Sequence, residues 1–279
     1  MIISVIKDGL GNQLFMYACG YAAARKAHGK FILDATYLAT SNLRRYELGM
    51  LKIRYDGLIN ISVSFPYVLK VAIRKLVHGL IKLVTKPYNE KITYEFDASV
   101  LALKSSYCLC GYWQSEKYFK EYRDEILPML TPNYSTTKSF NSTLAKIQNT
   151  QSISVHVRRG DFIALGFCLD EKYYKNSIEL MLKKVSKPIF YFFSDDIEYA
   201  KKHCLFEGLD VEIEFVSYEA INPIVEDFLL MKSCKHNIIA NSSYSWWSAW
   251  ANNNPEKIVL CPKREARDFF YPAEWIVVS

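Results

Sequence analysis

The segment Ile153-Ser154-Val155-His156-Val157-Arg158-Arg159-Gly160-Asp161 passes from an apolar run into a polar loop. The apolar part predicts a buried strand, and its C-terminal end is the edge at which open α/β sheets bind ligands. Adjacent guanidinium groups are almost never buried without partners, and each offers a planar donor fork to phosphate or carboxylate oxygens. Two interpretations stay open: an ion pair with Asp161 or another nearby acid, and a site for an anionic ligand beside His156.

The rest of the C-terminal half alternates apolar runs with helical segments. Further strands are expected at 189–193, 211–216, 236–240 and 257–261. Asn222-Pro223 predicts a helix start, because asparagine caps helices and proline fits their first position. An aromatic helix is expected from Tyr244 to about Asn253. Strands and helices that alternate at this spacing indicate a parallel, Rossmann-like sheet.

Polar residues follow two of these predicted strands. Asp195-Asp196 could be a metal-binding pair, but we expect one of the two to recognise guanine or ribose, because neighbouring strand-end residues point to opposite faces. The turn Asn241-Ser242-Ser243 either presents backbone N–H groups to a phosphate or simply caps the next helix. In that helix the spacing of Trp246, Trp247 and Trp250 predicts a buried cluster.

Five blocks in chain order resemble glycosyltransferase family 11, the α-1,2-fucosyltransferases that use GDP-fucose. They are Gly9-Leu10-Gly11-Asn12-Gln13-Leu14-Phe15, the block Gly111 to Phe119, His156 to Asp161, Phe193 to Asp196, and Asn241 to Trp247. The similarity runs from about Ile3 to about Trp275. The family's opening loop usually has two glycines before Leu-Gly-Asn-Gln, and Asp8 replaces the first of them. That substitution makes the backbone shape of the loop a point to check.

The resemblance implies an α/β protein with two Rossmann-like domains that face each other, the GT-B type of glycosyltransferase architecture. We expect an acceptor-side domain at 1–150 and a GDP-fucose-binding domain at 151–279, joined within the Pro-, Ser- and Thr-containing stretch 127–151. The implied reaction is inverting transfer of L-fucose to a galactose 2-hydroxyl of a glycan, such as a surface polysaccharide or O-antigen repeat unit.

Departure of GDP requires positive charge at the diphosphate. We expect Arg158 to supply it, assisted by Arg159 and the N–H groups near Ser242 and Ser243, with no metal or other cofactor. The predicted donor-binding residues are His156, Arg158, Arg159, Asp195, Asp196, Asn241, Ser242, Ser243, Gly11, Asn12 and Gln13. The attacking hydroxyl needs a base or a hydrogen-bond acceptor, and the candidates are Asp161, Glu116 and Asp8.

The opening loop has a competing interpretation. A strand at 2–6, the glycines of Gly9-x-Gly11, a helix from Asn12 to about His28, and a strand ending in Asp34 approximate the dinucleotide-binding fingerprint. Leu14 occupies the position of its third glycine. An NAD-dependent oxidoreductase therefore stays as an alternative, as does a non-catalytic protein that binds nucleotide sugars or glycans.

Composition limits the class of protein. Half of the 279 residues are hydrophobic and 15% are aromatic, which excludes wholesale disorder and suffices for two α/β domains. Seven scattered cysteines and the lack of a signal peptide predict a reducing compartment. No apolar run is long enough for a membrane span. We therefore expect a cytoplasmic enzyme, and the absence of a recognised module argues against nucleic-acid binding.

Residues 68–84 form a cationic amphipathic pattern. Basic residues recur three or four positions apart among leucines, at Lys70, Arg74, Lys75, His78 and Lys82. One interpretation is an ordinary helix whose leucines pack inward and whose basic face is solvated. The other is weak docking on the anionic inner face of the cytoplasmic membrane, where a lipid-linked, galactose-containing acceptor would be found.

Overall fold

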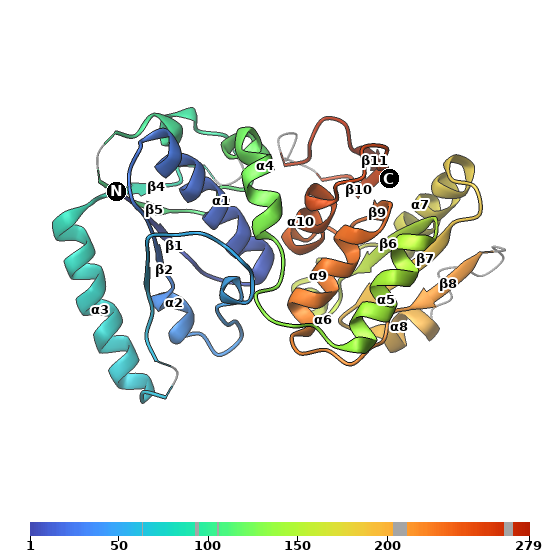
Figure 1. Cartoon of the computed structure of the whole chain (residues 1–279), viewed down its shortest axis with the longest axis horizontal. Helices are drawn as coiled ribbons and strands as arrows, with labels where there is room; N and C mark the ends of the chain where they lie inside the picture. The colour runs from blue at the N-terminus through green and yellow to red at the C-terminus, as the bar shows by residue number, and fades with distance from the viewer. Residues whose placement is uncertain (63, 93–94, 105, 203–210, 265–269) are drawn as a thin grey trace. The chain divides into compact units, whose positions relative to one another are not determined.

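The chain forms two compact α/β units, which divide between Asn133 and Tyr134 (Figure 1). The computed structural model describes residues 1–279 except 63, 93–94, 105, 203–210 and 265–269. The division falls inside the predicted linker, but earlier than the predicted boundary between 150 and 151. The reason is helix α5 (Lys138–Asn149), which buries Phe140 and Ile147 within the second unit.

The first unit contains a five-stranded sheet in the order β3-β2-β1-β5-β4, with every neighbouring pair parallel. Its strands are β1 (Ile2–Val5), β2 (Phe31–Asp34), β3 (Gly57–Ile59), β4 (Lys86–Asn89) and β5 (Tyr107–Cys110). Its α-helices are α1 (Leu10–Lys26), α2 (Thr36–Ala39), α3 (Tyr67–Val84) and α4 (Arg123–Ile126). Short 3-10 helices lie at Leu48–Met50, Ala98–Ala102, Glu116–Tyr118, Lys120–Tyr122 and Leu127–Met129.

Helix α1 is almost entirely buried, and a glycine lets it approach the sheet closely. A Cβ atom added at Gly20 would lie 2.6 Å from the Phe31 ring and 2.9 Å from Ser4 Cβ. Close helix–sheet packing is the role that the dinucleotide fingerprint gives to its third glycine, so here Gly20 performs it in place of Leu14. The helix was predicted to run to about His28, but it ends at Lys26, and His28 lies in the left-handed region at φ 49°.

The second unit contains a six-stranded, all-parallel sheet in the order β11-β10-β9-β6-β7-β8. Its strands are β6 (Ser152–Val157), β7 (Ile189–Ser194), β8 (Glu212–Phe215), β9 (His236–Ile238), β10 (Val259–Pro262) and β11 (Ile276–Val278). Counted along the chain, this is the Rossmann order 3-2-1-4-5-6. The predicted class, an α/β protein with two parallel-sheet domains, is confirmed.

Helices cover both faces of the second sheet, because the strands of a parallel sheet have apolar side chains on both sides. They are α5, α6 (Gly160–Leu165), α7 (Glu171–Lys184), α8 (Ile197–Lys202), α9 (Pro223–Ser233) and α10 (Ser243–Ala251). One face packs against α7, where Tyr173, Ile178 and Met181 meet the apolar side of β6. On the other face the buried Asn237 amide donates to Ser154 Oγ (2.7 Å) and to a carbonyl of α9 (2.9 Å).

The aromatic helix is part of the core, as predicted. Trp246 and Trp247 are fully buried and Trp250 nearly so, with the rings of Trp246 and Trp250 stacked 6.2 Å apart. Ser242 caps this helix by accepting the Tyr244 N–H at 3.2 Å. The cluster therefore anchors the polar turn that precedes it.

Candidate functional site

Eight of the eleven predicted donor-binding residues belong to the second unit, near the point where its sheet reverses its strand order. Open α/β sheets bind ligands outside the carboxyl ends of the strands at such a switch point. Here it lies between β6 and β9, which are neighbours in the sheet. Arg158 and Arg159 follow β6, and Asn241-Ser242 follows β9 shortly after its end.

Arg158 is held by two carboxylates. Its Nη2 atom lies 2.5 Å from Asp161 Oδ1, and its Nη1 atom lies 2.8 Å from Asp195 Oδ2. The guanidinium also lies 5.5 Å from the centre of the Phe162 ring. Its position is therefore set by groups from α6 and from the end of β7. The ion pair with Asp161 or another acid, one of the two interpretations open from the sequence, is present in this structure.

Arg159 has its own pair of contacts. Its Nε atom lies 3.2 Å from Asp196 Oδ2, and its guanidinium stacks on the Tyr199 ring, 3.2 Å from the ring centre. The Arg159 backbone N–H donates to Asp195 Oδ1 at 2.9 Å. Asp195 thus bridges the two arginines, and Asp195 and Asp196 serve different partners, as expected for neighbours at a strand end.

The charge balance of this cluster differs from what the paired arginines alone suggest. Two guanidinium groups face three carboxylates, so the cluster has one negative charge in excess. In the described part of the chain no group of three or more His, Cys, Asp or Glu side chains is arranged to hold a metal ion. An anionic ligand at this edge therefore needs additional donors from the neighbouring strand ends.

Arg264 is a further cation at this edge of the sheet, and it was not among the residues predicted for the site. It follows β10, the strand beside β9, and its Nη2 atom donates to the Asn241 carbonyl oxygen. Asn241 Nδ2 in turn donates to the Phe167 carbonyl at 2.8 Å. A basic residue after a strand that neighbours the switch point was the available signal. It was missed because Arg264 lies outside the family-like blocks.

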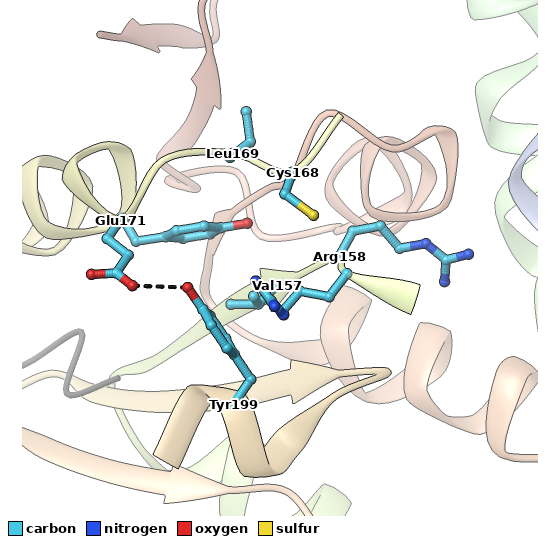
Figure 2. Close-up of a pocket in the computed structure, with 8 residues that line it drawn as sticks. Val157, Arg158, Cys168, Leu169, Glu171 and Tyr199 are labelled. Atoms are coloured by element: carbon cyan, nitrogen blue, oxygen red, sulfur yellow. Dashed lines mark hydrogen bonds between the residues drawn. The ribbon is translucent and has the colours of Figure 1, made fainter. Parts of the chain in front are cut away.

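A small pocket opens beside the arginines, on the side facing α7 and α8 (Figure 2). Figure 2 shows Glu171 and Tyr199 joined across it by a hydrogen bond of 2.8 Å, with Arg158 extending away from them. Burial and the Glu171 carboxylate raise the pKa of Tyr199, so its hydroxyl stays protonated. Neither side chain has a sequence signal, because α7 and α8 are brought to β6 only by the fold.

His156 lies under this edge instead of within it. Its side chain is 5% exposed, its ring centre is 5.5 Å from that of Tyr244, and burial together with Arg158 lowers its pKa to about 3. The imidazole is therefore neutral. Its Nδ1 atom is buried without a hydrogen-bond partner among the described residues.

The first unit has a corresponding site at its own switch point, between β1 and β5. Two of the family-like blocks meet there. The Tyr112 hydroxyl donates to Asp8 Oδ2 at 2.6 Å, and Gln114 Nε2 donates to Asn12 Oδ1 at 2.7 Å. Asp8 adopts the left-handed φ of 62°, which explains why glycine is usual at this position.

Two predicted residues of the opening loop do not present themselves to a ligand. Gln13 is fully buried, its Nε2 donates to the carbonyls of Asp8 and Arg45, and its Oε1 accepts the Glu47 N–H. Because both ends of its amide are occupied, Gln13 fixes the loop. Gly11 is buried within α1. Glu116 opens a 3-10 helix in this unit, whereas Asp161 belongs to the second unit.

Comparison with known proteins gives consistent matches along the whole chain. Residues 1–278 match the model of glycosyl transferase family 11. The chain is 32% identical to the Escherichia coli alpha-1,2-colitosyltransferase, over 100% of this chain and 99% of that protein. It is also 32% identical to the Escherichia coli O-antigen biosynthesis glycosyltransferase WbnK, over 94% of this chain and 93% of that protein.

A solved structure has a similar fold. A mutant of Arabidopsis thaliana FUT1 in complex with GDP superposes with a TM-score of 0.51 at 11% identity, covering 95% of this chain and 71% of that one. The paired arginines, the Asn-Ser-Ser turn and the opening loop therefore lie in a chain that belongs to glycosyl transferase family 11.

Proposed function

We propose that this chain is an inverting transferase that moves L-fucose from GDP-fucose to a galactose 2-hydroxyl of a surface-polysaccharide or O-antigen repeat unit. The observation that supports it most is the position of Arg158 and Arg159 at the switch point of a Rossmann-ordered sheet, beside the Asn241 turn. Relatives named as an alpha-1,2-transferase and as an O-antigen enzyme support the linkage and the acceptor class. Family membership makes the oxidoreductase alternative untenable.

In the proposed mechanism Arg158 neutralises the diphosphate as GDP departs. Two of its N–H groups hold Asp161 and Asp195, so the guanidinium is oriented in advance and its other N–H groups can face the donor. Arg264 and the backbone N–H groups at Ser242 and Ser243 offset the excess of carboxylates. This scheme requires no metal ion at the diphosphate.

The base for the acceptor hydroxyl is proposed among the carboxylates already named. Asp161 lies within the arginine cluster, and its carboxylate would accept the proton while it stays paired with Arg158. Glu116 is the candidate from the first unit. Asp8 is the weaker candidate, because it already accepts the Tyr112 hydroxyl.

The decisive test is substitution of Arg158. Arg158→Ala should raise the barrier by about 2–4 kcal/mol, mostly through kcat, because one preorganised donor to the leaving group is lost. Arg158→Lys should restore little, since an ammonium lacks the planar fork. Arg25→Ala is the matched control, because Arg25 lies in the first unit and forms an exposed ion pair with Glu125. Wild-type turnover in Arg158→Ala would refute the assignment.

The choice of donor sugar is tested separately. Colitose is fucose without the 3-hydroxyl, and a site that hydrogen-bonds a hydroxyl rejects the analogue that lacks it far more strongly than an apolar site does. We expect GDP-fucose to be preferred over GDP-colitose in a competition assay, with the product linkage assigned by NMR. Calorimetry with GDP, GDP-mannose and NAD completes the comparison, and binding of NAD alone would exclude the proposal.

A further inference from the structure

Helix α3 exposes its apolar side to solvent. Val68 is 79% exposed, Leu76 64% and Leu83 81%, and they lie on one side of the helix. Ala72, Leu69, Leu80 and Val84 continue the same exposed surface. We call these seven residues the outer stripe of α3. A helix in a globular protein ordinarily turns such a stripe toward the core. In α3 the stripe faces solvent instead.

The opposite side of α3, which contains several of its basic residues, holds the helix to the first unit. Arg74 Nη1 donates to Thr40 Oγ1 at 2.6 Å, and its guanidinium lies 5.3 Å from the centre of the Tyr37 ring. His78 Nε2 lies 3.4 Å from the buried Asp34 carboxylate. Among the described residues of α3, Ile81 is the one that is buried, and it packs against Ile3 and Cys108 of the sheet.

These contacts contradict the first of the two earlier interpretations of the segment and restrict the second. The leucines of the outer stripe do not pack inward, so α3 is not an ordinary helix with a wet basic face. The second interpretation, weak docking on an anionic membrane, stays a prediction, but Arg74 and His78 are engaged with Thr40, Tyr37 and Asp34 and would contribute less charge to it. What remains exposed is an apolar stripe with two lysines beside it.

The charge of α3 indicates what covers the stripe. The helix contains no aspartate or glutamate, and Lys75 and Lys82 are exposed along one border of the stripe. Phe65 and Tyr67 are exposed at its N-terminal end, where aromatic rings favour the boundary between lipid and water. If a second copy docked on the stripe, its Lys75 and Lys82 would lie close to the same two lysines of the first copy, and the like charges would repel. An anionic partner would instead be attracted.

We propose that α3 is a monotopic membrane-docking helix, which lies in the headgroup region of an anionic bilayer with its outer stripe inserted. Its 18 residues make a rod of about 27 Å parallel to the surface. Helices with this division between apolar and basic sides lie on membranes instead of crossing them. Consistently, α3 does not meet the requirements of a membrane span. The inference goes beyond the proposed function, since it does not depend on which sugar is transferred.

The test is co-sedimentation of the full chain with vesicles. Wild type should pellet with vesicles of phosphatidylcholine and phosphatidylglycerol, and more weakly with phosphatidylcholine alone. Leu76→Gln/Leu83→Gln removes two inserted side chains. Each buried leucine should contribute roughly tenfold or more to binding, so the vesicle partition coefficient of this variant should fall about a hundredfold. Lys75→Gln/Lys82→Gln should lower binding to the anionic vesicles by about twentyfold and abolish its salt dependence.

A matched control uses exposed apolar residues outside α3. Leu43 is 88% exposed and Ile92 is 58% exposed, so Leu43→Gln/Ile92→Gln should pellet like wild type. Transfer to a soluble oligosaccharide should be unchanged in Leu76→Gln/Leu83→Gln, which separates this inference from the proposed function. The inference is overturned if wild type ignores both kinds of vesicle, if the leucine variant still binds, or if that variant instead converts a dimer to a monomer.

Discussion

Gly160 lies where a side chain would collide with the group that orients Arg158. An added Cβ would be 2.5 Å from Asp195 Oδ2, and Asp195 cannot move without loosening both its ion pair with Arg158 and its bond from the Arg159 N–H. Gly160→Ala should therefore lower kcat about tenfold or more, equivalent to about 1.4 kcal/mol or more in the barrier, while the fold persists. Steady-state kinetics and thermal unfolding would measure the two effects.

The matched control for this substitution is Gly79→Ala. Gly79 has nothing within 4 Å of an added Cβ and lies in α3, so alanine should stabilise the protein by about 0.5–1 kcal/mol without changing kcat. Wild-type kcat in Gly160→Ala would show that Asp195 need not hold Arg158 in place.

His156 couples the stability of the second unit to pH. Its pKa is about 3 in the folded chain, and the usual value of a histidine is about 6.5. Because the unfolded chain takes up the proton first, full stability holds above pH 6.5 and is lost progressively as the pH falls toward 3. The loss amounts to about 1.4 kcal/mol per pH unit in this window.

Replacing the imidazole should remove this contribution. His156→Gln should show a flatter stability profile, so that the gap between wild type and variant narrows by about 2 kcal/mol from pH 7 to pH 5. Urea unfolding at several pH values would measure it. Parallel profiles for the two proteins would mean that His156 has the same pKa in the folded and the unfolded chain.

At the scale of elements, the opening of α1 depends on one strained residue. The left-handed φ of Asp8 destabilises the folded chain, whereas the hydrogen bond that its carboxylate accepts from the Tyr112 hydroxyl stabilises it. Asp8→Ala keeps the strain and loses the bond, whereas Asp8→Gly loses both. The glycine variant should be the more stable of the two by about 1 kcal/mol. Chemical denaturation would compare them, and equal stabilities would mean that the loop relaxes into another conformation.

The sequence predicted the elements that have a strong local signal. The apolar run of β6 and the Asn222-Pro223 start of α9 are where they were expected, and Asn222 Oδ1 accepts the Val225 N–H as a helix cap does. β4 was not predicted, because Lys86-Pro87-Tyr88-Asn89 is mostly exposed and contains a proline, and only its pairing with β5 makes it a strand. β3 and β11 were not predicted either, because three residues are too few to give a local pattern.

The candidate site was predicted in its parts and not in its connections. The blocks containing Arg158, Asp195 and Asn241 were each recognised, since each follows an apolar run. Their contacts depend on the strand order, which places β6 between β7 and β9. No local sequence pattern predicts that order. The same limit applies to α3, whose spacing predicts an amphipathic helix but does not say which side faces the protein.

For the whole molecule, the proposed scheme supplies cations from the chain itself. EDTA should leave fucosyl transfer essentially unchanged, because in the proposed scheme Arg158, Arg264 and backbone N–H groups would neutralise the departing diphosphate. Activity with and without chelator, followed by addition of magnesium or manganese, would measure this. Loss of activity that metal restores would instead direct attention to Asp195 and Asp196 as ligands.

The two strand orders have different consequences while the chain is being made. In the second unit β6 comes first and lies in the interior, so each later strand adds to an edge that already exists, and β9 completes the switch point only after β7 and β8. In the first unit β4 leaves the ribosome before β5, the strand that must separate it from β1. In a nascent chain that ends near residue 100, β4 therefore has no strand edge with which to pair. The first sheet can be completed only after β5 is synthesised, whereas each new strand of the second sheet finds its neighbour already present.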